Sequence, residues 1–305
     1  MLAYTAKRLV LAIAVAFTIS ALVFSLLYMT GDPATALAGE NATSESIEKL
    51  RKAYGFDRPI AVQYLSWLGN ALQGDFGNSI YFRMPVSELI FDRLPTTMIL
   101  GVCAITFAIA LAIPLGVLAA MFPNSLIDRA ALSLAVVGQA LPSFWFALML
   151  IVMFAFTYPI LPASGSETWQ HFVLPTIVLG YYATPAFMRL TRTGMLDVLS
   201  SDYIRTAKAK GLRPFTVLFK HALRNAIIPV VSLAAVQFGF MLGGSVIIET
   251  VFALHGAGYL AWESIARSDF PTVQAVLLLF SVFYIVLTFL SDMLNAWLDP
   301  RIRVG

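Results

Sequence analysis

Long apolar runs are the feature that most constrains how this chain can fold. The first, Leu9–Met29, carries no charged side chain, and at about 1.5 Å per residue a helix of this length crosses the roughly 30 Å hydrocarbon core of a bilayer. Hydrophobic residues make up 59% of the chain and charged residues only 12%, whereas about 25% of an average soluble domain is charged. The sequence therefore predicts an integral membrane protein with a single membrane domain.

Six such runs predict an all-α protein with six membrane spans. The expected spans are Leu9–Met29, Thr96–Met121, Ala130–Phe156, Phe172–Leu190, Ile227–Val251 and Thr272–Leu294. Pro114 and Pro142 are expected to interrupt the second and third spans, because proline leaves a backbone carbonyl unpaired and this is tolerated where protein or a water-filled cavity satisfies it. The fourth span is the least apolar, so we expect it to face other helices rather than lipid.

The interval between the first two spans predicts a small helical layer outside the membrane. A charged helix is expected over Ser44–Tyr54 with a stop at Gly55, and an amphipathic helix opens at Pro59 and runs to about Gln73. The chain therefore divides into residues 1–30 with the first span, residues 31–95 as this layer, and residues 96–305 as a core of five spans.

The first run has a second interpretation, a cleaved signal peptide. Ala36-Leu37-Ala38 has the small-x-small pattern of a cleavage site. However, the apolar run is longer than the 7–15 residues of a typical signal core, and the cut would fall well past its end. A membrane span is the favoured interpretation.

Basic residues predict which side of the membrane each loop occupies. The polar stretch Ser200–Pro229 holds six Lys and Arg residues, while the short loops on the opposite side hold only Arg267. Because short loops rich in Lys and Arg stay in the cytoplasm, we expect both termini and Ser200–Pro229 to be cytoplasmic and the layer of residues 31–95 to be periplasmic.

The stretch Ser200–Pro229 also reads as a docking element. Ser200 or Ser201 suits a helix N-cap and Gly211 suits the position just past the helix end. The small residues Ala207, Ala209 and Gly211 form a face that permits close approach. A second helix is expected to open at Pro214, and its apolar positions follow helical spacing at Phe215, Leu218, Phe219, Ala222 and Leu223.

This stretch resembles the E-A-A-x-x-x-G loop of bacterial ABC importer permeases. Arg205-Thr206-Ala207 stands at the place of E-A-A, and Gly211 stands at the place of the glycine. The run Asp202–Gly211, followed by His221–Ala226 and Pro229, is similar to the first permease subunit of the dipeptide, oligopeptide and nickel importers. Further similar segments are Gly31-Asp32-Pro33, Gln63-Tyr64-Leu65, Gly74–Gly77, Asp269-Phe270-Pro271 and Asp299–Arg303.

The resemblance implies a multi-pass subunit of the bacterial inner membrane that is a transport component and not an enzyme. Its implied partners are a second permease, two ABC ATPase subunits, a periplasmic or lipoprotein substrate-binding protein and membrane lipid, with no nucleic acid. The chain itself is expected to bind no cofactor, because ATP and Mg²⁺ would sit on the ATPases. The implied cargo is a di- or oligopeptide or a similar small solute.

The same resemblance implies which residues couple the chain to an ATPase, within a coupling loop over residues 193–226. They are Asp202, Tyr203, Ile204, Arg205, Thr206, Ala207, Lys208, Ala209, Lys210 and Gly211. Their role is mechanical contact through a short coupling helix, so no catalytic residue is expected among them.

Candidate residues of a translocation path cluster around the proline of the third span. They are Gln139, Pro142, Ser143, Phe144 and Trp145, together with Glu249 near the end of the fifth span. The alternatives are an ordinary packing kink at Pro142 and, for Glu249, a structural ion pair with a residue such as Arg267.

Other functions find less support in the sequence. We find no G-x-x-x-x-G-K-[ST] phosphate loop, no H-E-x-x-H zinc motif and no G-x-S-x-G nucleophile motif. A self-contained secondary transporter or channel is the main alternative. It would need coupling-ion groups near the bilayer midplane, and no acidic residue is central to any expected span.

Overall fold

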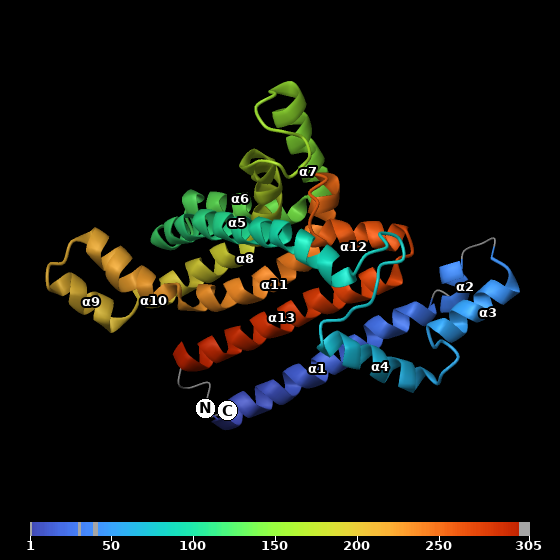
Figure 1. The fold of residues 1–305 in the computed structure, drawn as a ribbon. Coiled ribbons are helices and arrows are strands. Elements are labelled where there is room, and N and C mark those ends of the chain that lie inside the picture. The colour runs from blue at the N-terminus through green and yellow to red at the C-terminus, as the bar shows by residue number, and fades with distance from the viewer. Residues whose placement is uncertain (1, 30–31, 39–41, 299–305) are drawn as a thin grey trace.

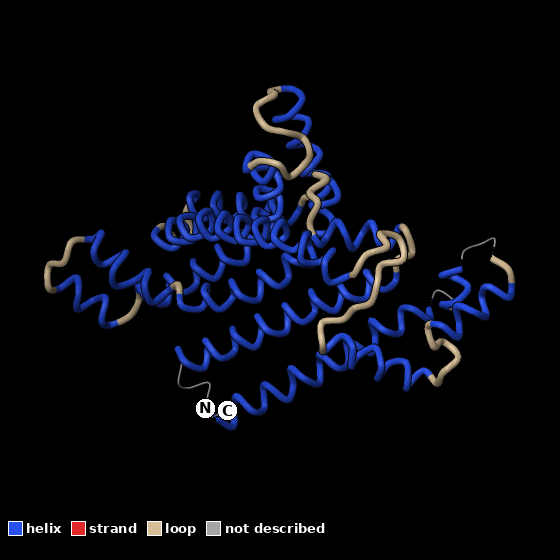
Figure 2. Tube along the Cα trace, in the orientation of Figure 1, coloured by secondary structure: helices blue, strands red, loops and turns tan. Residues whose placement is uncertain are grey.

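The fold was obtained as a computed structural model that describes residues 2–29, 32–38 and 42–298 of the 305. The described residues form helices joined by loops, with no strand among them (Figure 2). The α-helices are α1 Leu2–Met29, α2 Pro33–Ala38, α3 Ser44–Ala53, α4 Ile60–Leu72, α5 Val86–Met121, α6 Leu126–Ala140, α7 Ser143–Ile151, α8 Val173–Leu199, α9 Asp202–Ala209, α10 Arg224–Ala226, α11 Ile228–Val251, α12 Ala257–Ala266 and α13 Phe270–Leu298. Two π-helical segments, η1 Val152–Thr157 and η3 Thr216–Leu223, and a 3₁₀ turn, η2 Trp169–Phe172, complete the set.

The long helices run alongside one another, most of the short ones lie at their two ends, and α7 projects away from the bundle (Figure 1). In Figure 1 α9 and α10 lie at one end of the bundle, whereas α2, α3, α4 and α12 lie at the other. The start of α1 and the end of α13 share the end near α9, where Arg8 pairs with Asp292 at 2.8 Å. This contact ties the start of α1 to the end of α13.

Helix α8 is the centre of the bundle, as the low apolarity of the fourth expected span predicted. It packs against α5, α6, α7 and α11, and Leu174, Val178, Phe187 and Met188 are almost completely buried in it. Gly180 lets α5 approach closely, since a Cβ built there would lie 2.5 Å from the Ala104 carbonyl oxygen. Thr184 and Thr191 are buried as well, whereas Tyr182 is 40% exposed, so protein covers only part of the polar surface of α8.

Four helical segments in the described part of the chain are long and apolar enough to cross a membrane. They are Tyr4–Ser25, Val86–Met121, Ile228–Val251 and Phe270–Ala296. The pair Leu126–Ala140 and Ser143–Thr157 passes the same criterion only when taken together, and α8 does not pass it. In its described part the chain is thus helical without strands, with four candidate spans, or five if the bent pair is one.

The two expected proline interruptions have different outcomes. In α5 the expectation was wrong, because the helix begins at Val86 and continues through both Pro95 and Pro114 to Met121. The third expected span does break, and its halves are bent by 97° where Leu141 and Pro142 separate α6 from α7. Pro142 N-caps the second half with φ −58° and ψ 128°, an extended conformation that ends the preceding helix.

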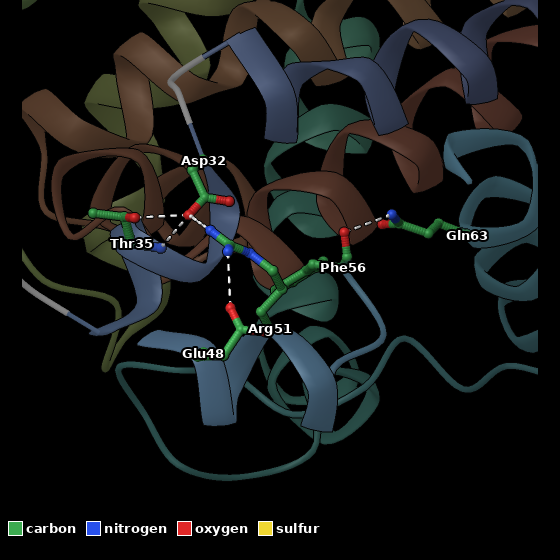
Figure 3. Close-up of polar contacts among 6 residues, drawn as sticks. All are labelled: Asp32, Thr35, Glu48, Arg51, Phe56 and Gln63. Atoms are coloured by element: carbon green, nitrogen blue, oxygen red, sulfur yellow. Dashed lines mark hydrogen bonds and ion pairs between the residues drawn. The ribbon is translucent and has the colours of Figure 1, made fainter. Parts of the chain in front are cut away.

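The layer between α1 and α5 matches its sequence pattern closely. Helix α3 ends at Ala53 ahead of Gly55, whose φ is +70°, and α4 opens after Pro59. Figure 3 shows the polar contacts that hold this layer together: Arg51 donates to Asp32 at 2.8 Å and to Glu48 at 3.0 Å. Gln63 on α4 donates to the carbonyl oxygen of Phe56 at 3.2 Å and ties α4 to the turn after α3.

Candidate coupling surface and pathway residues

Helix α9 is the short helix that the polar stretch predicted. Ser201 occupies its N-cap in an extended conformation, with Asp202 in the first turn and Lys208 in the last. Gly211 follows its end with φ +72°, the left-handed conformation that glycine adopts without steric cost. A Cβ on Gly211 would meet nothing within 4 Å, so this residue is constrained by its backbone angle and not by its neighbours.

The residues of α9 divide into an inward and an outward set. Ile204 is fully buried and Ala207 is 7% exposed, and both pack with Met195 of α8, Val217 and Ala222 in one apolar cluster. The outward set is exposed and comprises Asp202, Tyr203, Arg205, Thr206, Lys208, Ala209, Lys210 and Gly211. The expected small face is therefore split, because Ala207 contacts this chain's own core while Ala209 and Gly211 remain open.

The segment after α9 is helical, but its period differs from the α-helical period on which the expected spacing of apolar residues rests. Residues 216–223 form a π-helical segment, which winds more widely than an α-helix and shifts the inward positions. Val217 and Ala222 are buried, whereas Phe215 is 71% exposed and Phe219 is 43% exposed. The apolar positions of the expected helical spacing therefore include both exposed and buried side chains.

Exposed aromatic and basic side chains therefore share the end of the molecule formed by α9 and η3. The rings of Phe215 and Phe219 lie 4.4 Å apart between centroids. Tyr203 is 44% exposed, and its hydroxyl accepts a hydrogen bond at 2.9 Å from Asn225 of α10. Arg205 pairs with Asp202 on the same exposed side. We call the exposed residues of α9 together with Phe215 and Phe219 the α9 surface.

The structure brings five of the six expected pathway residues together at the α6–α7 bend. Gln139, Phe144 and Trp145 are exposed there, beside Pro142 and the half-buried Ser143. Trp145 also lines an open apolar groove of about 520 Å³ along α7 and η1, together with Leu148, Met149, Val152, Met153 and Thr157. The bend is thus a real break in the third apolar segment with exposed polar and aromatic side chains.

Glu249, the sixth expected residue, lies in a different environment. Its side chain is fully buried near the end of α11, where it accepts a hydrogen bond from the Thr97 hydroxyl at 2.7 Å and from the Tyr259 backbone N–H at 2.9 Å. The Ala257 N–H donates to the Thr97 oxygen at 2.8 Å. The carboxylate therefore holds the N-terminus of α12 against α5 and α11, which matches the preference of helix N-termini for anions.

The expected ion pair between Glu249 and Arg267 is not formed. The Arg267 guanidinium instead lies over the ring of Tyr81, 4.7 Å from the ring centroid. Gly256 explains why the turn before α12 suits this arrangement, since a Cβ there would lie 2.4 Å from a carboxylate oxygen of Glu249. Glycine at position 256 is what allows the carboxylate to reach the helix N-terminus.

A second buried carboxylate, Asp269, holds the loop before α5 to the start of α13. It accepts hydrogen bonds from the Ile80 N–H at 3.0 Å, from the Thr272 hydroxyl at 2.7 Å and from the Ser79 hydroxyl. A third, Asp128, pairs with Arg192 between α6 and α8. The sequence patterns assigned no role to Asp128, because its partner is far away in the chain and only the fold brings the two together.

No cluster of three or more His, Cys, Asp or Glu side chains suited to a metal ion occurs in the described ranges. The buried carboxylates of Asp128, Glu249 and Asp269 are each paired with donors of this chain.

Two family models together match nearly the whole chain. The model described as "Binding-protein-dependent transport system inner membrane component" matches residues 112–304, and a model of the N-terminal part of such components matches residues 1–101. Curated relatives agree: the glutathione transport system permease protein GsiC of Escherichia coli strain K12 is 40% identical over 304 residues and covers 99% of both chains. GsiC of Shigella flexneri serotype 5b gives the same identity and coverage.

Solved structures are similar in fold. The MetNI methionine ABC transporter in an inward-facing conformation matches with a TM-score of 0.56 and 18% identity, covering 68% of this chain and 95% of that one. An amino acid ABC transporter crystallised with histidines matches with a TM-score of 0.50 and covers 70% of this chain and 94% of the other. With two family models and a full-length relative at 40% identity, this chain belongs to the inner membrane components of binding-protein-dependent transport systems, the permease subunits of ABC importers.

Proposed function

We propose that this chain crosses the inner membrane six times with both termini and the α9 surface in the cytoplasm. The course of the helices supports this: α1 and α11 run away from the α9 end, whereas α5, α8 and α13 run toward it (Figure 1). Helix α6 leaves the α9 end and is followed by the bend, so α6 and α7 supply the remaining crossing. Helix α8 counts as a span because the other helices surround it, which offsets its lower apolarity.

The α9 surface docks on an ABC ATPase subunit, and its ten expected coupling residues divide into two roles. Ile204 and Ala207 fix α9 to α8 and η3 from inside. The exposed set, with the Phe215–Phe219 pair beside it, makes the contact. Aromatic side chains suit the centre of an interface and basic side chains suit its rim. Residues 193–226 act as the coupling loop, and ATP and Mg²⁺ are bound and used on the ATPases alone.

The remaining partners follow from the division of the chain. A second permease subunit completes the translocation path, with Gln139, Pro142, Ser143, Phe144 and Trp145 facing it at the bend. The layer of residues 31–95 lies in the periplasm and receives the substrate-binding protein. Glu249 shapes the outer end of the path indirectly by holding α12, since its carboxylate is buried against protein donors.

Short peptides are the substrate class. The observation that carries this is the full-length 40% identity to permeases named for glutathione, a tripeptide. In the architecture proposed here, selection rests largely on the binding protein that delivers the solute.

Reconstitution tests the proposal. Proteoliposomes would hold this chain, the second permease and the ATPases encoded beside it, with the cognate binding protein outside and labelled glutathione as the probe. We expect accumulation that requires ATP and all four kinds of subunit, and competition by unlabelled tripeptides. ATP-independent uptake through this chain alone would contradict the proposal, and so would ATP binding by the isolated chain.

A further inference from the structure

A buried ion pair joins α6 to α8 close to the α9 surface. Arg192 donates to Asp128 through two nitrogens, with Nε 2.7 Å from Oδ1 and Nη2 2.6 Å from Oδ2. The Asp128 side chain is 4% exposed and the Arg192 side chain 22% exposed. The Asn124 backbone N–H donates to Asp128 Oδ2 at 2.9 Å, so the carboxylate also fixes the turn between α5 and α6. A bidentate pair of this kind restricts orientation as well as distance.

On one side the pair connects to α9. Arg192 lies one turn before Met195, which is fully buried in the apolar cluster that holds Ile204 and Ala207 of α9. Gly194 packs against the backbone after η3, since a Cβ there would lie 2.7 Å from the Ala226 carbonyl oxygen. A displacement of α9 therefore acts on the end of α8 that carries Arg192.

On the other side the pair connects to the bend. Asp128 lies in the first turn of α6, and α6 ends at Ala140 just before Leu141 and Pro142. Near that far end the Tyr181 hydroxyl of α8 donates to the Leu134 carbonyl oxygen, and a Cβ on Gly138 would lie 2.5 Å from the Tyr181 carbonyl oxygen. Helix α6 is thus fastened to α8 at both ends, and its only charged fastening among these contacts is Asp128–Arg192.

We propose that Asp128 and Arg192 are positioning residues that make α6 follow α8, so that movement of α9 reaches the α6–α7 bend. The inference rests on the proposed function, since it assumes that α9 is driven by an ATPase. Other contacts keep the bundle folded. This pair fixes the register and angle of α6 relative to α8, at the end of α6 that receives the movement of α9. Without the ion pair, ATP hydrolysis therefore continues but no longer drives rearrangement at the bend.

The test measures movement at the bend in the complex with its ATPases. In a parent with Cys103 replaced, Trp145→Cys in α7 reports on the bend through its rate of reaction with a thiol reagent. The rate is measured without nucleotide and with a non-hydrolysable ATP analogue, and ATP hydrolysis is measured on the same preparations. The parent should show a nucleotide-dependent change of about fivefold or more, the lower end of coupling between distant sites.

Asp128→Asn should remove that change while the complex still binds its ATPases and hydrolyses ATP. The reversed pair, Asp128→Arg with Arg192→Asp, should restore at least part of it. Arg192→Lys keeps the charge but loses the planar two-nitrogen geometry, so it should retain a reduced change and serves if stronger variants fail to accumulate. Asp292→Asn is the matched control, because it removes the 2.8 Å Arg8–Asp292 ion pair between α1 and α13 and should leave the response intact.

A parent-sized response in Asp128→Asn or Arg192→Lys would overturn the inference, and so would an equal loss in Asp292→Asn. A parent complex that binds no ATPase would overturn the proposed function and this inference with it. If the parent couples ATP hydrolysis to movement at the bend and Asp128→Asn does so equally well, the inference is overturned and the proposed function stands.

Discussion

Gly211 shows how a single residue sets the limits of the α9 surface. Sequence spacing placed it just past the helix end, and the structure gives it φ +72° with open space where a Cβ would stand. A larger side chain would therefore not collide with a neighbour. A substitution instead raises the free energy of the left-handed backbone conformation at this position. The increase is about 1–2 kcal/mol for residues other than glycine and, in part, asparagine.

The first prediction contrasts two substitutions at this position. Gly211→Ala should weaken recovery of the ATPases with the purified chain, because relaxing the strain redirects the chain after α9. Gly211→Asn should retain most of the recovery, although its side chain is larger, because asparagine tolerates the left-handed conformation. If the two variants lost ATPase binding in order of side-chain volume, packing against the partner and not backbone angle would be the constraint.

Asp32 supplies a prediction about pH. The Thr35 side chain donates to its carboxylate at 2.7 Å and lowers the pKa of Asp32, and Arg51 lowers it further. A lowered pKa in the folded layer means that the contact stabilises the layer above the ordinary carboxyl pKa of about 3.9. That contribution is lost as the pH falls through the lowered pKa.

Hydrogen exchange in α2 and α3, corrected for the intrinsic effect of pH, measures this loss. Protection should fall at acid pH in the parent, and Asp32→Asn should show the lower protection already at neutral pH. An identical acid response in the parent and in Asp32→Asn would rule out Asp32 as the group responsible.

At the scale of the element, α12 depends on a carboxylate from another helix. Glu249→Leu removes both acceptor oxygens, so the Tyr259 N–H and the Thr97 hydroxyl lose their partner, and an unpaired buried polar group costs about 1–3 kcal/mol. We expect exchange of α12 amides to accelerate by about tenfold or more, with little change in α1 or α13. Glu263→Leu, on the half-buried side of α12, is the control and should have no such effect.

Gly256→Ala tests the same arrangement from the other partner. Its methyl group would meet Glu249 Oε2 at 2.4 Å and the Thr97 hydroxyl at 2.6 Å, so the turn before α12 must shift. The variant should reproduce the exchange pattern of Glu249→Leu, and normal protection of α12 in Gly256→Ala would show that the contact is not what holds the helix.

Elements were predictable from the sequence where the signal is local, and they were missed where it depends on packing. Gly55, Pro59 and Gly211 each act through their own backbone, so α3, α4 and α9 end or begin close to the expected residues. A proline has no such fixed outcome: the chain bends before Pro142, yet α5 continues through Pro114. The π-helical period of residues 216–223 leaves no trace in apolar spacing, so the spacing did not distinguish the exposed Phe215 and Phe219 from the buried Ala222.

At the scale of the whole molecule, composition and the apolar runs predicted a helical membrane protein, whereas the cytoplasmic position and docking role of residues 200–229 stay predictions. They left the buried pairs unassigned, because Glu249 with Thr97 and Asp128 with Arg192 are joined only by the fold. Pairings at such sequence separation carry no local pattern, which is why the sequence suggested Arg267 as the partner of Glu249.

Topology gives a prediction for the entire chain. With Cys103 replaced, Lys49→Cys in α3 should react with an impermeant thiol reagent in intact cells from which the outer membrane is removed. Lys208→Cys in α9 should react only after the inner membrane is opened. Both positions are exposed in the structure, so burial does not protect them, and the reverse pattern of labelling would contradict the proposed orientation.

The most direct test of the account asks whether the α9 surface touches the ATPase. A photo-cross-linking residue at Arg205, whose side chain is 74% exposed, is compared with one at Lys49, whose side chain is 75% exposed, in membranes that contain the co-expressed ATPases. The account predicts an adduct between position 205 and an ATPase subunit and none from position 49. Absence of any ATPase adduct at position 205, in membranes where the parent complex hydrolyses ATP and transports, would contradict it.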